Sequence, residues 1–151
     1  MQGEWTVEIA APPGTVYALV SDLTRMGEFS PECERVEWLD GAAGPAVGSR
    51  FVGHNRGGPV KWSRRGRVVS AAPGREFSFV TEEGGREGTT WTYRLRASPG
   101  GTTVTESYQV HWIPWWMHVV DAVTFRRRQL RRNMATTLAQ LKASAESPPV
   151  R

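Results

Sequence analysis

The sequence predicts an α+β fold: a curved, seven-stranded antiparallel sheet around one long C-terminal helix, with two short helices after the first strand. Three observations indicate it: strand-like alternation in successive segments, Gly- and Pro-rich turns between them, and a final stretch, Trp116 to Ala143, without Gly or Pro. A sheet and an amphipathic helix bury their apolar faces against each other. The 151 residues fit a single domain. We expect it over residues 1–144, with residues 145–151 as a disordered tail.

The first elements are a strand and two short helices. Glu4–Ile9 alternates apolar and polar residues, which is typical of a strand. Pro12-Pro13-Gly14 ends this strand, and apolar residues at helical spacing across Val16–Leu23 predict a short helix. A second short helix around Met26–Phe29 ends at Pro31.

The middle of the chain consists of strands separated by turns, and the end is helical. The last helix carries one apolar face, formed by Val120, Val123, Leu130, Met134, Leu138 and Leu141. Six further strands are predicted: Glu34–Leu39, Arg50–Arg56, Val60–Ser70, Glu76–Thr81, Thr89–Ala97 and Thr102–Trp112.

Composition limits the partners and the compartment. The net charge is +4, but Lys61 and Lys142 are the only lysines. We attribute this arginine bias to a GC-rich genome and expect no nucleic-acid partner. No apolar run approaches the ~20 residues of a membrane span, so we expect no stable membrane insertion. Without a signal peptide pattern and with one cysteine, we expect a cytoplasmic protein, as a monomer or homodimer.

A sheet wrapped around a single helix leaves a gap, which is the natural ligand site. Strand alternation places a set of mostly aromatic side chains on the inner face. On the helix, spacing puts Arg127 at or beside the inner stripe of Val123, Leu130 and Met134. The inward strand residues are Phe51, Asn55, Trp62, Arg64, Trp91, Tyr93, Glu106 and Tyr108.

Buried charges on that face require partners. An Arg64–Glu106 pair across a wet cavity satisfies both groups. The alternative is a buried ion pair that holds the sheet together and has no ligand role.

Nucleophilic and metal chemistry find little support in the sequence. Cys33 lies between Glu32 and Glu34, whose negative charge raises a thiol pKa, and no histidine lies in its segment. We therefore interpret Cys33 as a small wall or core residue. The histidines lack two-ligand spacing and there is no second thiol, so we expect no metal and no cofactor.

Several stretches together resemble one superfamily. They are "APPGTVYALVSDLTRMGEFSPEC", "VGSRFVGHNRGG" followed by Trp62, "PGREFSF" and "WTYRLRASPGGTTVTESYQV". With the order of elements, they resemble the helix-grip fold of the START-like, or SRPBCC, superfamily, in its bacterial polyketide cyclase/dehydrase branch. The resemblance covers nearly the whole chain and concerns mostly turns and packing positions.

The resemblance implies a deep pocket between the sheet and the last helix. Members of the superfamily bind lipids, sterols, hormones or aromatic intermediates, and some cyclise or dehydrate poly-β-keto chains without metal or cofactor. In its aromatase/cyclases an inward arginine on a middle strand binds or polarises carbonyls. In "WSRRGRV" the alternation favours Arg64, matching the "RV" pair favours Arg67, and Arg65 lies between them.

The resemblance also assigns pocket positions near the first helices and on the last one. Met26 and Phe29 lie at the matching short helix, and Cys33 stands where some cyclases carry a tyrosine. Asn133, in "RRNM", faces the pocket from the last helix.

Two functions follow as hypotheses. The first is cofactor-free binding of a hydrophobic or aromatic small molecule, lipid- or polyketide-like. The alternative is a cyclase-like enzyme in which Arg64 stabilises an enolate oxygen and Glu106 or Tyr93 moves a proton. Four interpretations of the apolar segment "HWIPWWMH" remain open. It forms a mobile lip of the pocket, a dimer contact or a patch that touches a membrane, or it packs against the sheet.

Overall fold

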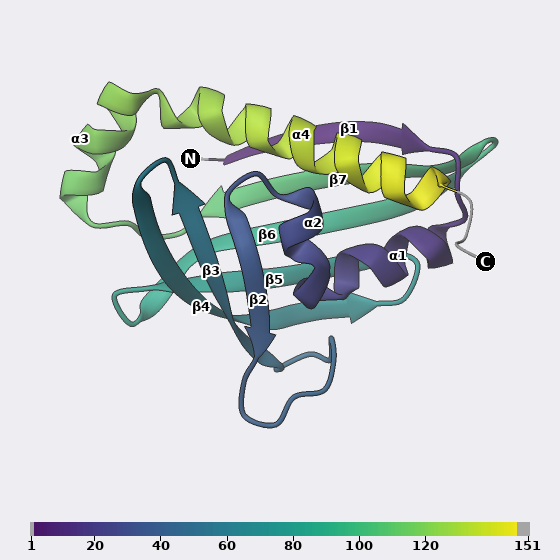
Figure 1. The fold of residues 1–151 in the computed structure, drawn as a ribbon, viewed down its shortest axis with the longest axis horizontal. Helices are drawn as coiled ribbons and strands as arrows, with labels where there is room; N and C mark the ends of the chain where they lie inside the picture. The colour runs from purple at the N-terminus through teal and green to yellow at the C-terminus, as the bar shows by residue number, and fades with distance from the viewer. Residues whose placement is uncertain (1, 148–151) are drawn as a thin grey trace.

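A computed structural model describes residues 2–147, except for the side chains of residues 121–124, and confirms the predicted α+β fold (Figure 1). A seven-stranded antiparallel sheet curves around the C-terminal helix, and short helices follow the first strand. The strands are β1 (Gln2–Ile9), β2 (Cys33–Trp38), β3 (Arg50–Gly57), β4 (Val60–Ala72), β5 (Glu76–Glu83), β6 (Arg86–Ser98) and β7 (Gly101–Val110). The helices are α1 (Pro13–Ser21), a 3-10 turn η1 (Leu23–Arg25), α2 (Met26–Phe29), α3 (Trp115–Thr124) and α4 (Arg126–Glu146).

The strand order explains why the sheet encloses α4. The order is β1-β7-β6-β5-β4-β3-β2, so the first two strands of the chain lie at opposite edges. The segment α1–η1–α2 joins these edges, and α4 runs along β1 (Figure 1). All strand pairs are antiparallel.

The curvature of the sheet has local causes. Register shifts interrupt β2, β4 and β5, and such bulges bend a strand and increase its twist. At Gly66 in β4, an added Cβ would lie 2.6 Å from the ring of Phe51 and 2.7 Å from the carbonyl oxygen of Val80. Only glycine therefore fits where the bent strand passes the inner ring of Phe51.

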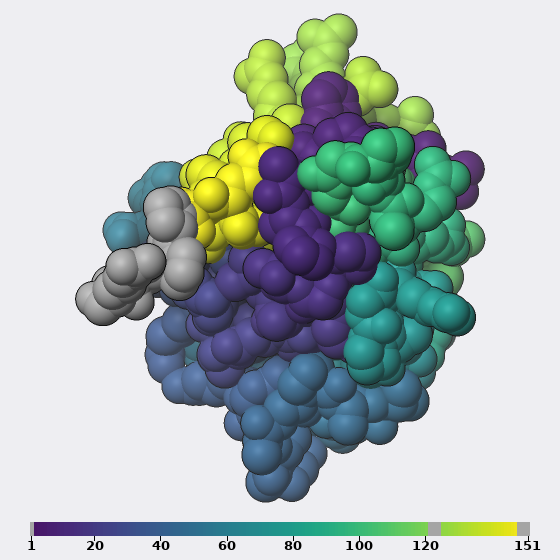
Figure 2. Space-filling view, turned by 90° about the vertical axis from the view of Figure 1, so that its right-hand side faces the viewer, coloured from purple at the N-terminus to yellow at the C-terminus, as the bar shows by residue number. Residues whose placement is uncertain are grey.

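The main hydrophobic core fills one end of the molecule. There the last turns of α4, carrying Leu138 and Leu141, pack against α1 and the sheet, where Val16 and Phe77 are fully buried. Figure 2 views this end, where α1, the end of α4 and the β6–β7 turn pack together without an opening. We call it the packed end.

The prediction of one uninterrupted helix from Trp116 to Ala143 is wrong. Phe125 adopts a left-handed conformation (φ 54°) and separates α3 from α4, which run in different directions (Figure 1). Its carbonyl accepts hydrogen bonds from the backbone N–H groups of Arg128 (3.1 Å) and Gln129 (3.2 Å), and so begins α4. A left-handed residue costs about 1–2 kcal/mol for side chains other than glycine, so contacts elsewhere in the fold maintain this break.

The C-terminal helix extends further than expected. Ala145 and Glu146, assigned by the sequence to the tail, belong to α4. The carboxylate of Glu146 accepts a hydrogen bond from the backbone N–H of Ala10 at 2.8 Å. Ser147 follows the last residue of α4, and residues 148–151 of the predicted tail lie outside the described residues.

Candidate functional site

A cavity of about 620 Å³ lies between the inner face of the sheet and the first half of α4. Its volume falls within the roughly 300–1,000 Å³ typical of small-molecule sites. We call this part of the molecule the hollow end. Leu130 and Met134 of α4 face the cavity, and Ile113, Trp116 and Met117 line it from α3 and the segment before it.

Most of the side chains that the sequence placed on the inner face line this cavity. The predicted residues found there are Met26, Cys33, Phe51, Asn55, Trp62, Arg64, Trp91, Tyr93, Glu106, Tyr108, Leu130, Asn133 and Met134. Phe29, in contrast, is buried in the main core, with the Arg25 guanidinium 5.9 Å from its ring centroid. The side chain of Val123 lies outside the described residues.

Aromatic rings form the walls of the cavity. Trp91 on β6 and Tyr108 on β7 are direct cross-strand partners, with ring centroids 5.4 Å apart. Phe51 on β3 and Phe79 on β5, on the same inner face, meet edge-to-face at the same centroid distance. Cross-strand aromatic pairs stabilise a sheet and present wide apolar surfaces, so the walls suit a flat or hydrophobic ligand.

A buried polar pair lies among these aromatic walls. Glu106 on β7 is only 4% exposed, and its Oε1 accepts a hydrogen bond of 3.0 Å from the hydroxyl of Tyr93, its partner on β6. The other carboxyl oxygen, Oε2, is buried and has no hydrogen-bond partner among the residues that the structure describes. An unpaired buried polar atom is costly, and this one belongs to a cavity-lining side chain.

Burial determines the protonation of this pair. Loss of solvent raises the pKa of Glu106 to about 8, against the opposing effect of the Tyr93 hydrogen bond. Burial and the neighbouring Glu106 also raise the pKa of Tyr93 well above its ordinary value. Glu106 is therefore mostly neutral at pH 7, and with Tyr93 donating to Oε1, the hydroxyl on Oε2 is a free donor.

The hypothesis that Arg64 pairs with Glu106 is wrong. Arg64 does face the cavity, as the alternation favoured over Arg65 or Arg67, but its Nη2 lies 2.8 Å from Oε2 of Glu83 on β5. Arg67 points to the outer face and pairs with Glu87. The cavity thus carries two separate polar groups: a deep neutral acid and a more accessible arginine–glutamate pair.

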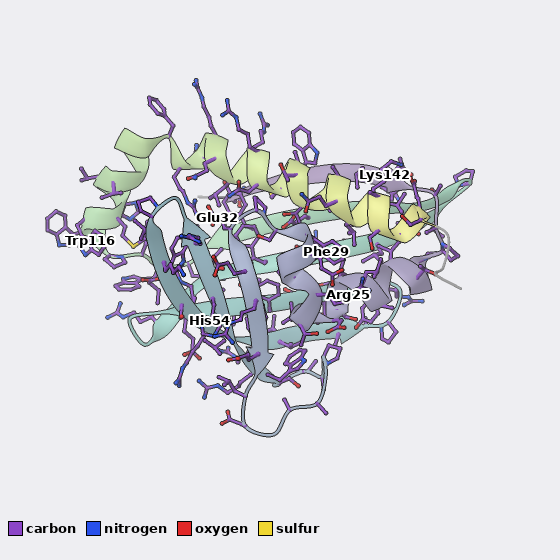
Figure 3. All side chains as sticks on the ribbon, viewed as in Figure 1. Arg25, Phe29, Glu32, His54, Trp116 and Lys142 are labelled. Atoms are coloured by element: carbon purple, nitrogen blue, oxygen red, sulfur yellow. The ribbon has the colours of Figure 1, made fainter. Side chains whose placement is uncertain are left out.

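A third set of polar side chains lines the cavity at the start of α4. Arg126 Nη1 donates to Glu32 Oε1 at 2.6 Å, and Asn133 Nδ2 donates to the same oxygen at 2.9 Å. Figure 3 shows Glu32 beside the first turns of α4. These contacts join the loop before β2 to the helix next to the break at Phe125.

This arrangement corrects the prediction for Arg127. Arg127 is exposed, and Arg126 takes the cavity-facing position. The break at Phe125 shifts the phase of α4 relative to a continuous helix, so the stripe extrapolated from Val123 does not continue through Arg127. Sequence reasoning missed Glu32 and Arg126 as cavity residues, since no local pattern connects them.

Cys33 lines the cavity as a thiol rather than a thiolate. Burial raises its pKa to about 11, with a smaller contribution from Glu34. Among the described residues, no three His, Cys, Asp or Glu side chains lie close enough together to hold a metal ion. His54 is on the outer face, where Nδ1 lies 2.9 Å from the hydroxyl of Ser63.

The curved sheet, the enclosed helix and the cavity between them define a helix-grip fold with an internal pocket. The chain belongs to the family described as "Polyketide cyclase / dehydrase and lipid transport", whose model matches residues 3–146. Within residues 2–147, no helix combines the length and hydrophobicity needed to cross a membrane. No curated protein matches the sequence.

Solved structures share this fold. The di-domain ARO/CYC StfQ of the steffimycin biosynthetic pathway aligns with TM-score 0.77 at 17% identity. The alignment covers 96% of this chain and 50% of StfQ, so this chain spans half the length of that protein. CV1439 from Chromobacterium violaceum aligns with TM-score 0.72 at 18% identity, over 97% of this chain and 99% of its own. The Polyketide_cyc-like protein Cgl2372 from Corynebacterium glutamicum is 34% identical, with TM-score 0.53, over 96% of this chain and 85% of its own.

Proposed function

We propose that the protein binds a hydrophobic or aromatic small molecule, lipid- or polyketide-like, in the cavity at the hollow end, without a cofactor. The observation that carries this proposal is the aromatic-walled cavity of about 620 Å³ between the sheet and α4. The family description and the fold shared with an ARO/CYC protein support a polyketide-related role.

Glu106 supplies the polar contact that orients such a ligand. Its neutral carboxyl group has a free donor on Oε2, while Tyr93 occupies Oε1. A ketone or hydroxyl oxygen on the ligand accepts that hydrogen bond and satisfies the buried atom. The favoured ligand is therefore a neutral, oxygen-bearing, largely apolar molecule.

Binding of 2-acetylnaphthalene, a neutral aromatic ketone, tests the proposal. Trp62 and Trp91 line the cavity, so quenching of tryptophan fluorescence reports its entry. The variant Asn55→Trp fills the cavity from β3, while His54→Trp places the same side chain on the outer face of that strand. We expect binding by the wild type and by His54→Trp, and at least about tenfold weaker binding by Asn55→Trp, a loss of about 1.4 kcal/mol.

Equal affinity of Asn55→Trp and His54→Trp would place the ligand elsewhere and reject the proposal. Native mass spectrometry of protein purified from its own host gives an independent test. A co-purifying hydrophobic or aromatic mass, absent from Asn55→Trp, is the expected result.

A cyclase-like enzyme is the second candidate, because Glu106 and Arg64 both face the same enclosed space. In an intramolecular aldol step, a 1,3-diketone first loses an acidic α-proton to solvent water, and Arg64 stabilises the resulting enolate oxygen. The enolate carbon then forms a bond with a ketone carbon of the same chain, and the C=O π bond of that ketone breaks to give an alkoxide, which takes the proton of Glu106. Tyr93 stabilises the Glu106 carboxylate through its existing hydrogen bond until the carboxylate regains a proton from solvent.

Arg64→Ala separates the two candidates. In an enzyme the variant loses product formation from a synthetic aryl β-triketone, followed by mass spectrometry, while 2-acetylnaphthalene still binds. In a carrier the wild type itself gives no cyclised product above the protein-free rate, and the variant only weakens binding moderately.

A further inference from the structure

The helix α3 and the break that follows it expose large apolar side chains beside the cavity. Trp115 is 78% exposed and Phe125 65% exposed, and Trp116 and Val119 are also more than half exposed. Figure 3 places Trp116 at the outer edge of the molecule, away from the packed end. We call Trp115, Trp116, Val119 and Phe125 the aromatic edge. Isolated exposed apolar residues are common, but several large ones along one helix and directly after it indicate an interaction surface.

A dense positive charge adjoins the aromatic edge. Residues 121–132 contain five arginines and one acidic residue, Asp121. Arg126 pairs with Glu32, whereas the other four, all exposed, form no ion pair with the described side chains. Those four arginines are Arg127, Arg128, Arg131 and Arg132.

Two of these arginines lie over exposed rings. The guanidinium of Arg128 is 5.6 Å from the ring centroid of Phe125, and that of Arg131 is 5.8 Å from the ring of Trp5. Such pairs keep aromatic rings and cations together on one surface. Exposed apolar and positive groups therefore follow one another along α3 and the first two turns of α4, and we call them together the patch.

We propose that this patch docks the protein on an anionic lipid surface. The aromatic edge would enter the boundary between headgroups and acyl chains, and the four arginines would bind lipid phosphates. This is interfacial adsorption, which needs no spanning helix.

Charge complementarity selects the membrane over a second copy of the chain. In a two-fold dimer the same patch meets itself, which would bring the arginines of one copy close to those of the other. An anionic bilayer offers both components the patch lacks: negative charge for the arginines and an apolar interior for the rings.

The patch also lies where a ligand would pass between protein and membrane. Trp116 and Met117 line the cavity and belong to the same helix as Trp115. Docking through α3 brings that part of the cavity wall against the lipid. The proposal goes beyond the proposed function, since docking needs no bound ligand.

Co-sedimentation with phosphatidylcholine vesicles, with and without phosphatidylglycerol, tests it. We expect binding to the anionic vesicles only, weakening steeply as salt increases. Each arginine near such a surface contributes roughly fivefold in affinity, about 1 kcal/mol, so Arg127→Gln with Arg132→Gln should lower binding about 25-fold. Arg94→Gln with Arg96→Gln, two exposed arginines on β6, is the matched control and should bind as the wild type does.

Trp115→Ser tests the apolar part, with Val47→Ser, at an exposed loop position, as its control. We expect weaker vesicle binding only for Trp115→Ser. Equal sedimentation with both vesicle types, or unchanged binding of the double arginine variant, would overturn the proposal. A concentration-dependent dimer that Trp115→Ser dissociates would assign the patch to a second copy instead. Unchanged binding of 2-acetylnaphthalene by these variants separates this test from that of the cavity.

Discussion

The two halves of α4 carry the same apolar stripe but serve different ends of the molecule. In the second half, Leu138 and Leu141 are buried in the main core against α1 and the sheet. In the first half, Leu130 and Met134 are equally shielded from solvent but face the cavity. Low exposure therefore does not mean tight packing. Stability should depend on the packed end and ligand binding on the hollow end.

Truncation of a core ring should have the largest effect on stability. Phe77 is completely buried at the packed end, so Phe77→Ala should lower the free energy of unfolding by about 3–5 kcal/mol. Trp62→Ala, at the hollow end, should cost much less because its ring borders the cavity instead of close-packed side chains. Urea unfolding of both variants compares the two ends. A similar loss for both would mean that the hollow end is as tightly packed as the core.

The pH dependence of stability should come next in size. The pKa of Glu106 is raised to about 8 in the folded protein, so the folded state retains a proton that the unfolded chain has released. The stabilisation that Glu106 contributes is fully present below the pKa that this group has in the unfolded chain. It is lost as the pH rises through about 8. At about 1.4 kcal/mol per pKa unit, the loss between pH 5 and pH 9 is on the order of 4 kcal/mol.

Glu106→Gln should remove this dependence while keeping the size of the side chain. The quantity to compare is the difference in unfolding free energy between wild type and variant at pH 5 and at pH 9. Glu4→Gln, on an exposed β1 side chain, is the control. A difference that stays constant across this range would show that Glu106 is ionised in the fold.

Loss of the Glu32 contacts should have an intermediate effect. Glu32→Gln weakens charge-assisted bonds from Arg126 and leaves the Asn133 contact, at a cost of about 1–2 kcal/mol. The neighbouring Glu34, which lies 3.7 Å from Arg56 on the exposed edge, provides the control Glu34→Gln. Chemical denaturation measures both; an equal, negligible change would show that the Glu32 contacts do not hold the loop to α4.

The smallest effect is expected at the exposed side of the packed end. Lys142 donates to the backbone oxygen of Glu8 at 2.9 Å and to Glu146 at 2.6 Å, but its side chain is 41% exposed. Exposed pairs contribute little, so Lys142→Met should lower the melting temperature less than Glu32→Gln does. A larger decrease would mean that the junction of β1 and α4 limits the stability of the whole fold.

The sequence predicted the strands and their facings because alternation and Gly/Pro turns are local signals. Trp62, Trp91 and Tyr108 could be placed on one face from spacing alone. The partner of Arg64 could not, since the predicted strand ended at Thr81 and left Glu83 in a turn, whereas β5 includes Glu83. The break at Phe125 was also beyond sequence reasoning, because neither Gly nor Pro marks it.

The single cysteine offers a practical way to observe the cavity in solution. Cys33 is the only thiol of the chain and borders the cavity, so a small fluorinated tag attached there reports from one known position. Its high pKa makes alkylation slow at neutral pH, so labelling calls for alkaline conditions. The fluorine NMR signal would then distinguish filled from vacant protein without any change to the natural sequence.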